Sequence, residues 1–240
     1  MLLREDGDAV VAIGQASHAW VSGQLARAWA WPVPEPREEL CLAAEQHDVG
    51  MAEWDLAPDV HPGTGRPLQF FEVPRPVHVE LWSHAAEKLL TQSRHAALLV
   101  SLHGTGLYER FPPREPEHQE LVRAHLAAQR ALQDRLAEEV GAAREDLRTA
   151  QRLLAAWDDL SLSLCFGRDR DVPDVPGPGG APVALALRGT TLDPWPFAAG
   201  EVALRAEGRR LAGRAAGRDE LRAMLDAAPH VPLRWTLRPA

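Results

Sequence analysis

The amino-acid sequence predicts a mainly α-helical bundle with a small β-rich element, which we expect the N-terminal strand and the C-terminal region to form together. Two observations lead to this prediction. Residues 117–140 and 144–166 repeat apolar side chains at the spacing of amphipathic helices. Strand-like runs occur near the two ends of the chain, at residues 9–13 and beyond residue 182.

The chain has 240 residues, which is enough for one large domain with an appendage. We expect a helical domain over residues 1–166 and a linker rich in Pro and Gly over residues 167–182. Residues 183–240 then form a β-rich extension that packs on the same domain. We expect this extension to pair with the N-terminal strand, because a few isolated strands are marginally stable alone.

Turn residues and prolines separate the first elements. The acidic, turn-like segment 5–8 precedes the apolar run 9–13, which indicates a short hairpin or edge strand. Helices are expected over about 15–29 and 37–49, with prolines between them. Gly50 is a natural stop for the second of these helices.

Residues 55–76 are rich in Pro and Gly and predict a long loop. Loops of this length inside a domain often line or cover functional sites. The remaining helices are expected at about 78–93, 96–107, 117–140, 144–166 and 219–228. The apolar stripe of helix 117–140 would permit a homodimer, although packing inside the chain explains the stripe more simply.

Charge and hydropathy limit the partners. The formal net charge of -8 argues against nucleic-acid binding, which normally uses a basic face. No apolar run approaches the roughly 18 residues of a membrane-spanning helix, and the first residues lack the features of a signal peptide. Cys41 and Cys165 lie in apolar segments, as free thiols of a reducing compartment do. We therefore expect a cytoplasmic protein without membrane or nucleic-acid partners.

His47 and Asp48 are adjacent at the end of a predicted helix. Neighbouring side chains on a helix diverge by about 100°, so both reach one metal ion only where the helix ends or is distorted. Gly50 gives the backbone that freedom. An isolated His-Asp pair is more often structural than metal-binding, so the case for a metal site depends on where other ligand-type residues fall.

Three further histidines fall on separate predicted helices. His18 lies on the first helix, and His78 begins the helix after the long loop. His103 follows the apolar run 97–102. Imidazole is a common metal ligand, so these positions are candidates for the same site as His47.

Asp158 lies in a helix that is otherwise apolar. A carboxylate buried there is costly unless it is paired, protonated or bound to metal. Leu154 and Ser161 share its side of the helix, so we expect Asp158 to face inward and Asp159 to face solvent.

Several short segments carry a resemblance to known families. They are Gln15–Ala19, Gln46–Asp55, Gly63–Leu68, Leu98–Gly104, Asp158–Leu162 and Leu192–Phe197. The order of the histidines and aspartates on successive helices resembles the HD-domain superfamily of metal-dependent phosphohydrolases. The amino-acid sequences of these segments resemble those of a bacterial family, domain-of-unknown-function family 3891.

The resemblance implies an HD-domain-like helical bundle that binds one or two divalent metal ions. One ion would be held by His18, His47, Asp48 and Asp158. A second would be held by Asp48, His78 and His103, which are also the expected catalytic residues. His84 is an alternative to His78. The sequence does not distinguish Fe, Mn, Zn and Mg.

The function that this resemblance implies is a metal-dependent phosphohydrolase, which uses a metal-activated water on a phosphomonoester, phosphodiester or nucleotide. A di-iron oxygenase of inositol-oxygenase type and a non-catalytic metal or ligand sensor are the alternatives. The candidates for substrate binding are Trp54, Asp55 and Arg66. Equally, Trp54 could be a packed side chain, Asp55 a helix cap and Arg66 a solvated surface residue.

Overall fold

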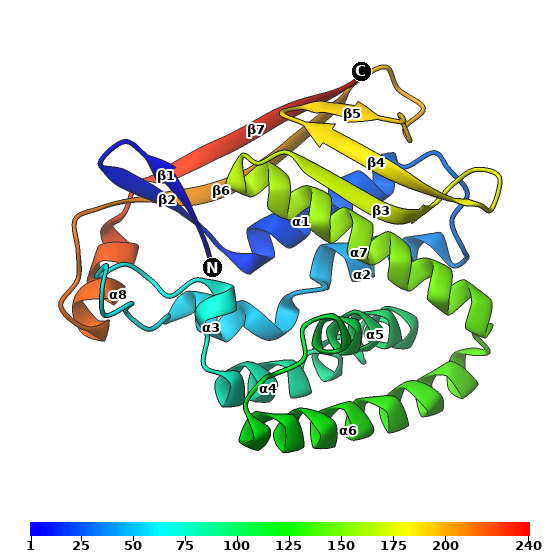
Figure 1. The fold of residues 1–240 in the computed structure, drawn as a ribbon, viewed down its shortest axis with the longest axis horizontal. Helices are drawn as coiled ribbons and strands as arrows, with labels where there is room; N and C mark the ends of the chain where they lie inside the picture. The colour runs from blue at the N-terminus through cyan, green and yellow to red at the C-terminus, as the bar shows by residue number, and fades with distance from the viewer.

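The computed structural model describes residues 1–240 and places a curved sheet against a group of helices (Figure 1). The sheet has seven strands in the order β1-β2-β6-β7-β5-β4-β3. The strands are β1 (Leu2–Asp6), β2 (Ala9–Ile13), β3 (Arg170–Pro176), β4 (Pro182–Arg188), β5 (Thr191–Asp193), β6 (Val202–Ala212) and β7 (His230–Pro239). Neighbouring strands are antiparallel except β5 and β7, which are parallel.

The helices are α1 (Gln15–Ala28), α2 (Arg37–Gln46), α3 (Ala52–Leu56), α4 (Arg75–Ser83), α5 (Arg94–Arg110), α6 (Pro116–Val140), α7 (Arg144–Phe166) and α8 (Arg218–Ala227). Short 3-10 turns occur at Val49–Met51, Phe70–Glu72 and Glu87–Leu89. No helix combines the length and the apolar character needed to cross a bilayer.

The expectation of a mainly α-helical bundle with a small β element is wrong. Helices make up 51% of the chain, and the seven strands form a mixed sheet shaped as a half-barrel. The segment expected as a linker, 167–182, contains β3. The prolines of β3 argue against a strand in the sequence, but β3 lies at the edge of the sheet, where proline is tolerated.

β6, with 11 residues, is the longest strand of the sheet. Its side chains alternate between buried and exposed from Val202 to Gly208, and arginines and a glutamate occupy much of the exposed face. This polar face makes the segment less apolar than a strand buried on both sides.

β2 joins the two ends of the chain, because it pairs with β6 and places Val10 opposite Leu211. Every residue of β2 is buried. Val10 and Leu211 pack in one apolar cluster with Leu221 and Leu225 of α8. The pairing between the N-terminal strand and the C-terminal region that we expected is therefore present.

An aromatic cluster joins the sheet layer to the helices. The ring of Trp29, at the end of α1, meets the rings of Trp157 and Phe197 edge to face, with centroids 5.6 Å away in each case. Trp157 belongs to α7, and Phe197 lies in the loop before β6. Both α1 and α7 pack on the sheet, so this cluster fixes the two helices relative to each other.

α5 is the central helix, and α6 covers it from outside together with α4 (Figure 1). The buried residues of α6 are Val122, His125, Gln129, Gln133 and Leu136. Packing inside the chain therefore accounts for its inward stripe, and a homodimer through this helix stays a prediction.

Gly104 of α5 permits close packing against α4, because a Cβ atom at this position would lie 2.6 Å from the ring of Trp82. Alanine is favoured over glycine by about 1 kcal/mol in a helix, but overpacking a core against a rigid ring costs about 1–3 kcal/mol. We expect Gly104→Ala to lower the free energy of unfolding by up to about 2 kcal/mol, measured by urea denaturation. Gly200→Ala, in open space, is the control, and equal stabilities of the two variants would contradict this account.

Candidate metal centre

Five ligand-type side chains meet where α1, α2, α5 and α7 approach one another. They are His18 on α1, His47 and Asp48 at the end of α2, His103 on α5 and Asp158 on α7. All are buried, and the most accessible of them, Asp158, is 8% exposed. Segments far apart in the sequence thus build one polar centre inside an apolar core.

The end of α2 lets neighbouring residues reach the same point. His47 still has helical backbone angles, whereas Asp48 leaves the helix with φ -101° and ψ 18°. Gly50 follows in a 3-10 turn, where a Cβ atom would lie 3.0 Å from both Ala85 Cβ and Leu81 O. The glycine therefore serves close packing against α4.

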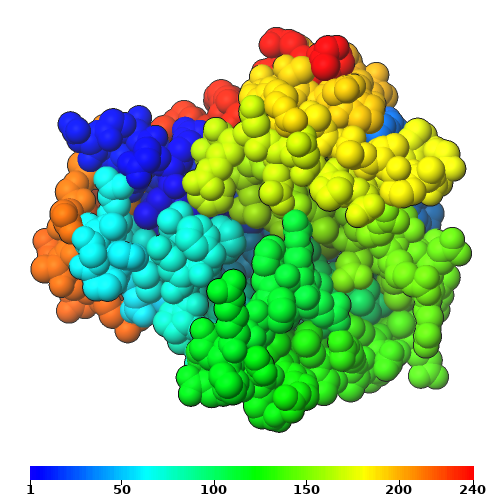
Figure 2. All heavy atoms as spheres, viewed as in Figure 1, coloured from blue at the N-terminus to red at the C-terminus, as the bar shows by residue number.

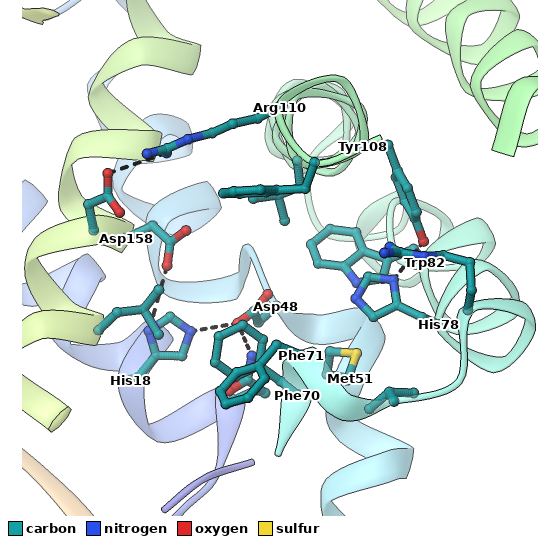
Figure 3. Close-up of a pocket in the computed structure, with 17 residues that line it drawn as sticks. His18, Asp48, Met51, Phe70, Phe71, His78, Trp82, Tyr108, Arg110 and Asp158 are labelled. Carbon is teal, nitrogen blue, oxygen red and sulfur yellow. Dashed lines mark hydrogen bonds and ion pairs between the residues drawn. The ribbon is translucent and has the colours of Figure 1, made fainter. Parts of the chain in front are cut away.

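The donor atoms of the centre lie close together. His47 Nε2 is 3.4 Å from Asp158 Oδ1 and 3.6 Å from Asp48 Oδ2. His103 Nε2 is 3.7 Å from Asp158 Oδ2, and His18 Nε2 is 2.5 Å from Asp48 Oδ2. Figure 3 shows His18, Asp48 and Asp158 turned toward one another at one end of the pocket.

Hydrogen bonds outside the centre orient two of the imidazoles. The Nδ1–H of His47 donates to the carbonyl of Ala44 at 2.8 Å, and His47 Nε2 has no hydrogen-bond partner. Ser161 Oγ donates to the carbonyl of Asp158 at 2.9 Å, so it accepts from His18 Nδ1–H at 2.8 Å. Each ring then presents Nε2 to the carboxylates, as metal-binding histidines do.

Electrostatics favour ionised carboxylates. Burial alone raises the pKa of Asp48, but His47 and His18 outweigh it and hold that pKa well below its usual range. The pKa of Asp158 is likewise lowered, against the effect of burial, by His47. Burial lowers the pKa of His47, yet Asp48 and Asp158 raise it to about 9. His103, buried beside the charged His47, has its pKa lowered to about 4. Two carboxylates thus face one imidazolium among these four groups.

These residues fit a divalent cation. Ligand atoms about 2.1 Å from one ion lie roughly 3.0–3.4 Å from each other, which is near the spacing of the donor atoms here. The buried Nε2 atoms of His47 and His103 lack any hydrogen-bond partner, and bound metal would satisfy both. Two groups of three ligands share His47. Because its Nε2 has one lone pair, His47 can ligate only one ion, so the two groups would act together as one site.

His78 lies apart from these five residues, in the wall of the pocket (Figure 3). Its Nδ1 is 2.6 Å from the hydroxyl of Tyr108, and its ring stacks on Trp82 with centroids 6.0 Å apart. His84, the alternative, is exposed and pairs with Glu87. The structure therefore does not bring His78 together with His103, which lies beside His47 and Asp158 instead.

The three candidates for substrate binding do not line the pocket. Trp54 is buried in the core. Asp55 accepts a hydrogen bond from the backbone N–H of Gln15. Arg66 forms an ion pair with Glu5 at 3.1 Å.

Three residues of the centre, His18, Asp48 and Asp158, form the floor of a cavity of about 330 Å³, whereas His47 and His103 do not line it. Its walls come from the 3-10 turn at residues 70–72, the start of α4, the end of α5, and α7. These segments meet on the face shown in Figure 2. Lining residues that the sequence did not single out include Arg75, Tyr108, Arg110, Phe70, Phe71 and Phe111. The long loop 55–76, which we expected to line a site, was a signal for Phe70, Phe71 and Arg75, and nothing in the sequence indicated Tyr108, Arg110 and Phe111.

Comparison with known proteins identifies the family. The model of a family described as a protein of unknown function, DUF3891, matches residues 1–213. The chain therefore belongs to this family, and the match includes every residue of the centre. No curated protein and no solved structure matches the chain, so the comparisons give no support for the HD-domain part of the resemblance.

His47 is the ligand that both groups of donors share. We expect His47→Ala to retain at least about 10-fold less metal than the unchanged protein. Even mutation of a residue that only supports a metal ligand lowers the metal affinity by about that factor. Elemental analysis of protein purified without a metal-affinity tag measures this. His84→Ala, which removes an exposed histidine, is the control. Equal metal content in all three proteins would show that the cluster is structural.

A second pair of variants tests whether the protein binds one metal ion or two per chain. We expect His103→Ala to lose the bound ion and His78→Ala to keep one ion per chain, because only His103 lies within ligand distance of the centre. The same elemental analysis decides the matter. Two ions per chain, one of them lost in His78→Ala, would support the dinuclear site that the HD-domain resemblance implies.

Proposed function

We propose that this protein is a metal-dependent phosphohydrolase acting on a small phosphomonoester, phosphodiester or nucleotide. The observation that carries the proposal is the placement of the His/Asp centre at the floor of a cavity that also presents arginines. The order of the ligands along the chain, which resembles that of HD-domain phosphohydrolases, adds support. A divalent ion held by the centre would lower the pKa of a bound water toward neutrality.

Arg75 is the side chain best placed to bind a phosphoryl group. It lines the cavity and forms no ion pair with a carboxylate, and its guanidinium lies 5.8 Å from the centre of the Tyr108 ring. Arg110 also lines the cavity, but Asp159 already pairs with it at 3.3 Å. An arginine without a carboxylate partner beside a cavity favours an oxyanion ligand.

The hydrogen bond from Tyr108 sets which ring nitrogen of His78 carries the proton. Burial raises the pKa of Tyr108, so its hydroxyl stays protonated and donates to His78 Nδ1. Burial, followed by the charge of Arg75, lowers the pKa of His78 to about 4. His78 is then neutral and carries its proton on Nε2, where it can donate to a phosphoryl or leaving-group oxygen in the cavity.

The reaction needs few groups beyond these. A water oxygen bonds to phosphorus, the ester P–O bond breaks, and the proton that the water loses is balanced by the proton that the leaving oxygen gains. Gln15 donates to Asp48 Oδ2 at 2.8 Å and so holds this carboxylate in place. A di-iron oxygenase would need a second set of ligands, whereas the two groups here share His47.

The direct test is hydrolysis of p-nitrophenyl phosphate and bis(p-nitrophenyl) phosphate by protein loaded with Mn²⁺, Fe²⁺ or Zn²⁺. We expect metal-dependent release of p-nitrophenol that chelation abolishes and that Asp158→Asn lowers at least about 100-fold, as loss of electrostatic stabilisation at an active site does. Metal-loaded protein that leaves both esters intact would contradict the proposal.

Arg75→Gln tests the anion site. Hydrogen bonds to charged groups contribute about 1.5–3 kcal/mol, so we expect kcat/KM for these esters to fall about 10- to 100-fold. Metal content should stay unchanged, because Arg75 is not a ligand. Arg94→Gln, which removes an arginine paired with Glu139, is the control. An unchanged kcat/KM in Arg75→Gln would place the phosphoryl group elsewhere.

A further inference from the structure

The mouth of the cavity carries exposed apolar surface. Phe71 and Phe111 are 61% and 57% exposed, and both line the cavity. Leu56 is the one other large hydrophobic side chain with comparable exposure, at 69%, and it does not line the cavity. Exposed apolar side chains gathered at one opening indicate a site for an apolar group.

The local structure holds these rings in place. Phe70 and Phe71 belong to a 3-10 turn that a capping box between Gln69 and Glu72 closes. Their rings meet edge to face with centroids 5.2 Å apart. Because the turn is hydrogen-bonded at its own ends, its backbone keeps both phenylalanines at the opening.

Phe111 lies directly after α5, and the guanidinium of Arg110 lies 5.2 Å from the centre of its ring. Arg110 is in turn paired with Asp159 of α7. Figure 3 shows Phe70 and Phe71 across the pocket from Arg110. The aromatic side chains therefore line two sides of one opening, above a polar floor.

The floor and the mouth have different chemistry. The floor holds the ligand centre and faces the unpaired Arg75, which favours an anionic group there. Apolar side chains, among them Val73, Leu107 and Leu162, make up more than half of the residues that line the cavity. The volume of about 330 Å³ suits a compact ligand.

We propose, on the basis of the proposed function, that the substrate is a phosphoester of an apolar alcohol, an aryl or short alkyl alcohol. Its phosphoryl group lies at the ligand centre and Arg75, and its hydrocarbon group lies between Phe70, Phe71 and Phe111. The ester is thus recognised at both ends, by charge at the floor and by apolar contact at the mouth.

The experiment compares phenylphosphonate with methylphosphonate, two probes that cannot be hydrolysed as esters. Isothermal titration calorimetry on the metal-loaded protein measures both dissociation constants. We expect phenylphosphonate to bind at least about 10-fold more tightly, since burial of a phenyl ring is worth that much or more. Phe71→Ser and Phe111→Ser should each reduce this ratio by about 3-fold or more. Leu56→Ser, an equally exposed position away from the cavity, should leave the ratio unchanged.

The outcomes separate this inference from the proposed function. Equal binding of the two phosphonates, with p-nitrophenyl esters still hydrolysed, would overturn the apolar specificity and leave the hydrolase in place. A phenyl preference that survives both Phe71→Ser and Phe111→Ser would also overturn it. A phenyl preference that depends on these residues, in protein without hydrolase activity, would support the apolar site and contradict the proposed reaction.

Discussion

Two buried carboxylates among three imidazoles are the interaction on which the rest of this structure depends. An unpaired carboxylate buried in protein costs several kcal/mol, and Asp48 and Asp158 are 5% and 8% exposed. They are stable because His18, His47 and His103 reach them from α1, α2 and α5. The four helices that meet here must therefore keep their relative positions. The sheet contributes by packing on α1 and α7, and the Trp29–Trp157–Phe197 cluster fixes the same pair of helices.

The centre determines what the cavity above it can do. Hydrogen bonds from His47 to Ala44 and from His18 to Ser161 leave Nε2 of each ring toward the carboxylates. A metal ion then has nitrogen and oxygen donors together, a mixture that suits Fe, Mn or Zn better than Mg, which prefers oxygen. Above this floor, Arg75 supplies positive charge, and the phenylalanines at the mouth supply apolar surface.

The sequence predicted which histidines and aspartates cluster better than it predicted the fold. Asp158 was expected to face inward because Leu154 and Ser161 share its side of the helix, and Asp158 is buried with Ser161 next to it. Asp159, by contrast, pairs with Arg110 and Arg170 instead of standing free in solvent. The HD-domain resemblance assigned His103 to a different group from His47, and local patterns could not show which distant helices converge. The size of the sheet was missed because edge prolines hide β3. Arg75 was missed because only its place in the long loop 55–76 distinguishes it from a surface arginine.

The central claim is that one metal ion binds among His18, His47, Asp48, His103 and Asp158. The most direct measurement is anomalous X-ray diffraction at the absorption edge of manganese or zinc, from crystals of the metal-loaded protein. This account predicts a single anomalous peak per chain, about 2.0–2.2 Å from the Nε2 atoms of the ligating histidines. A second peak beside His78, or no peak within the cluster, would contradict it.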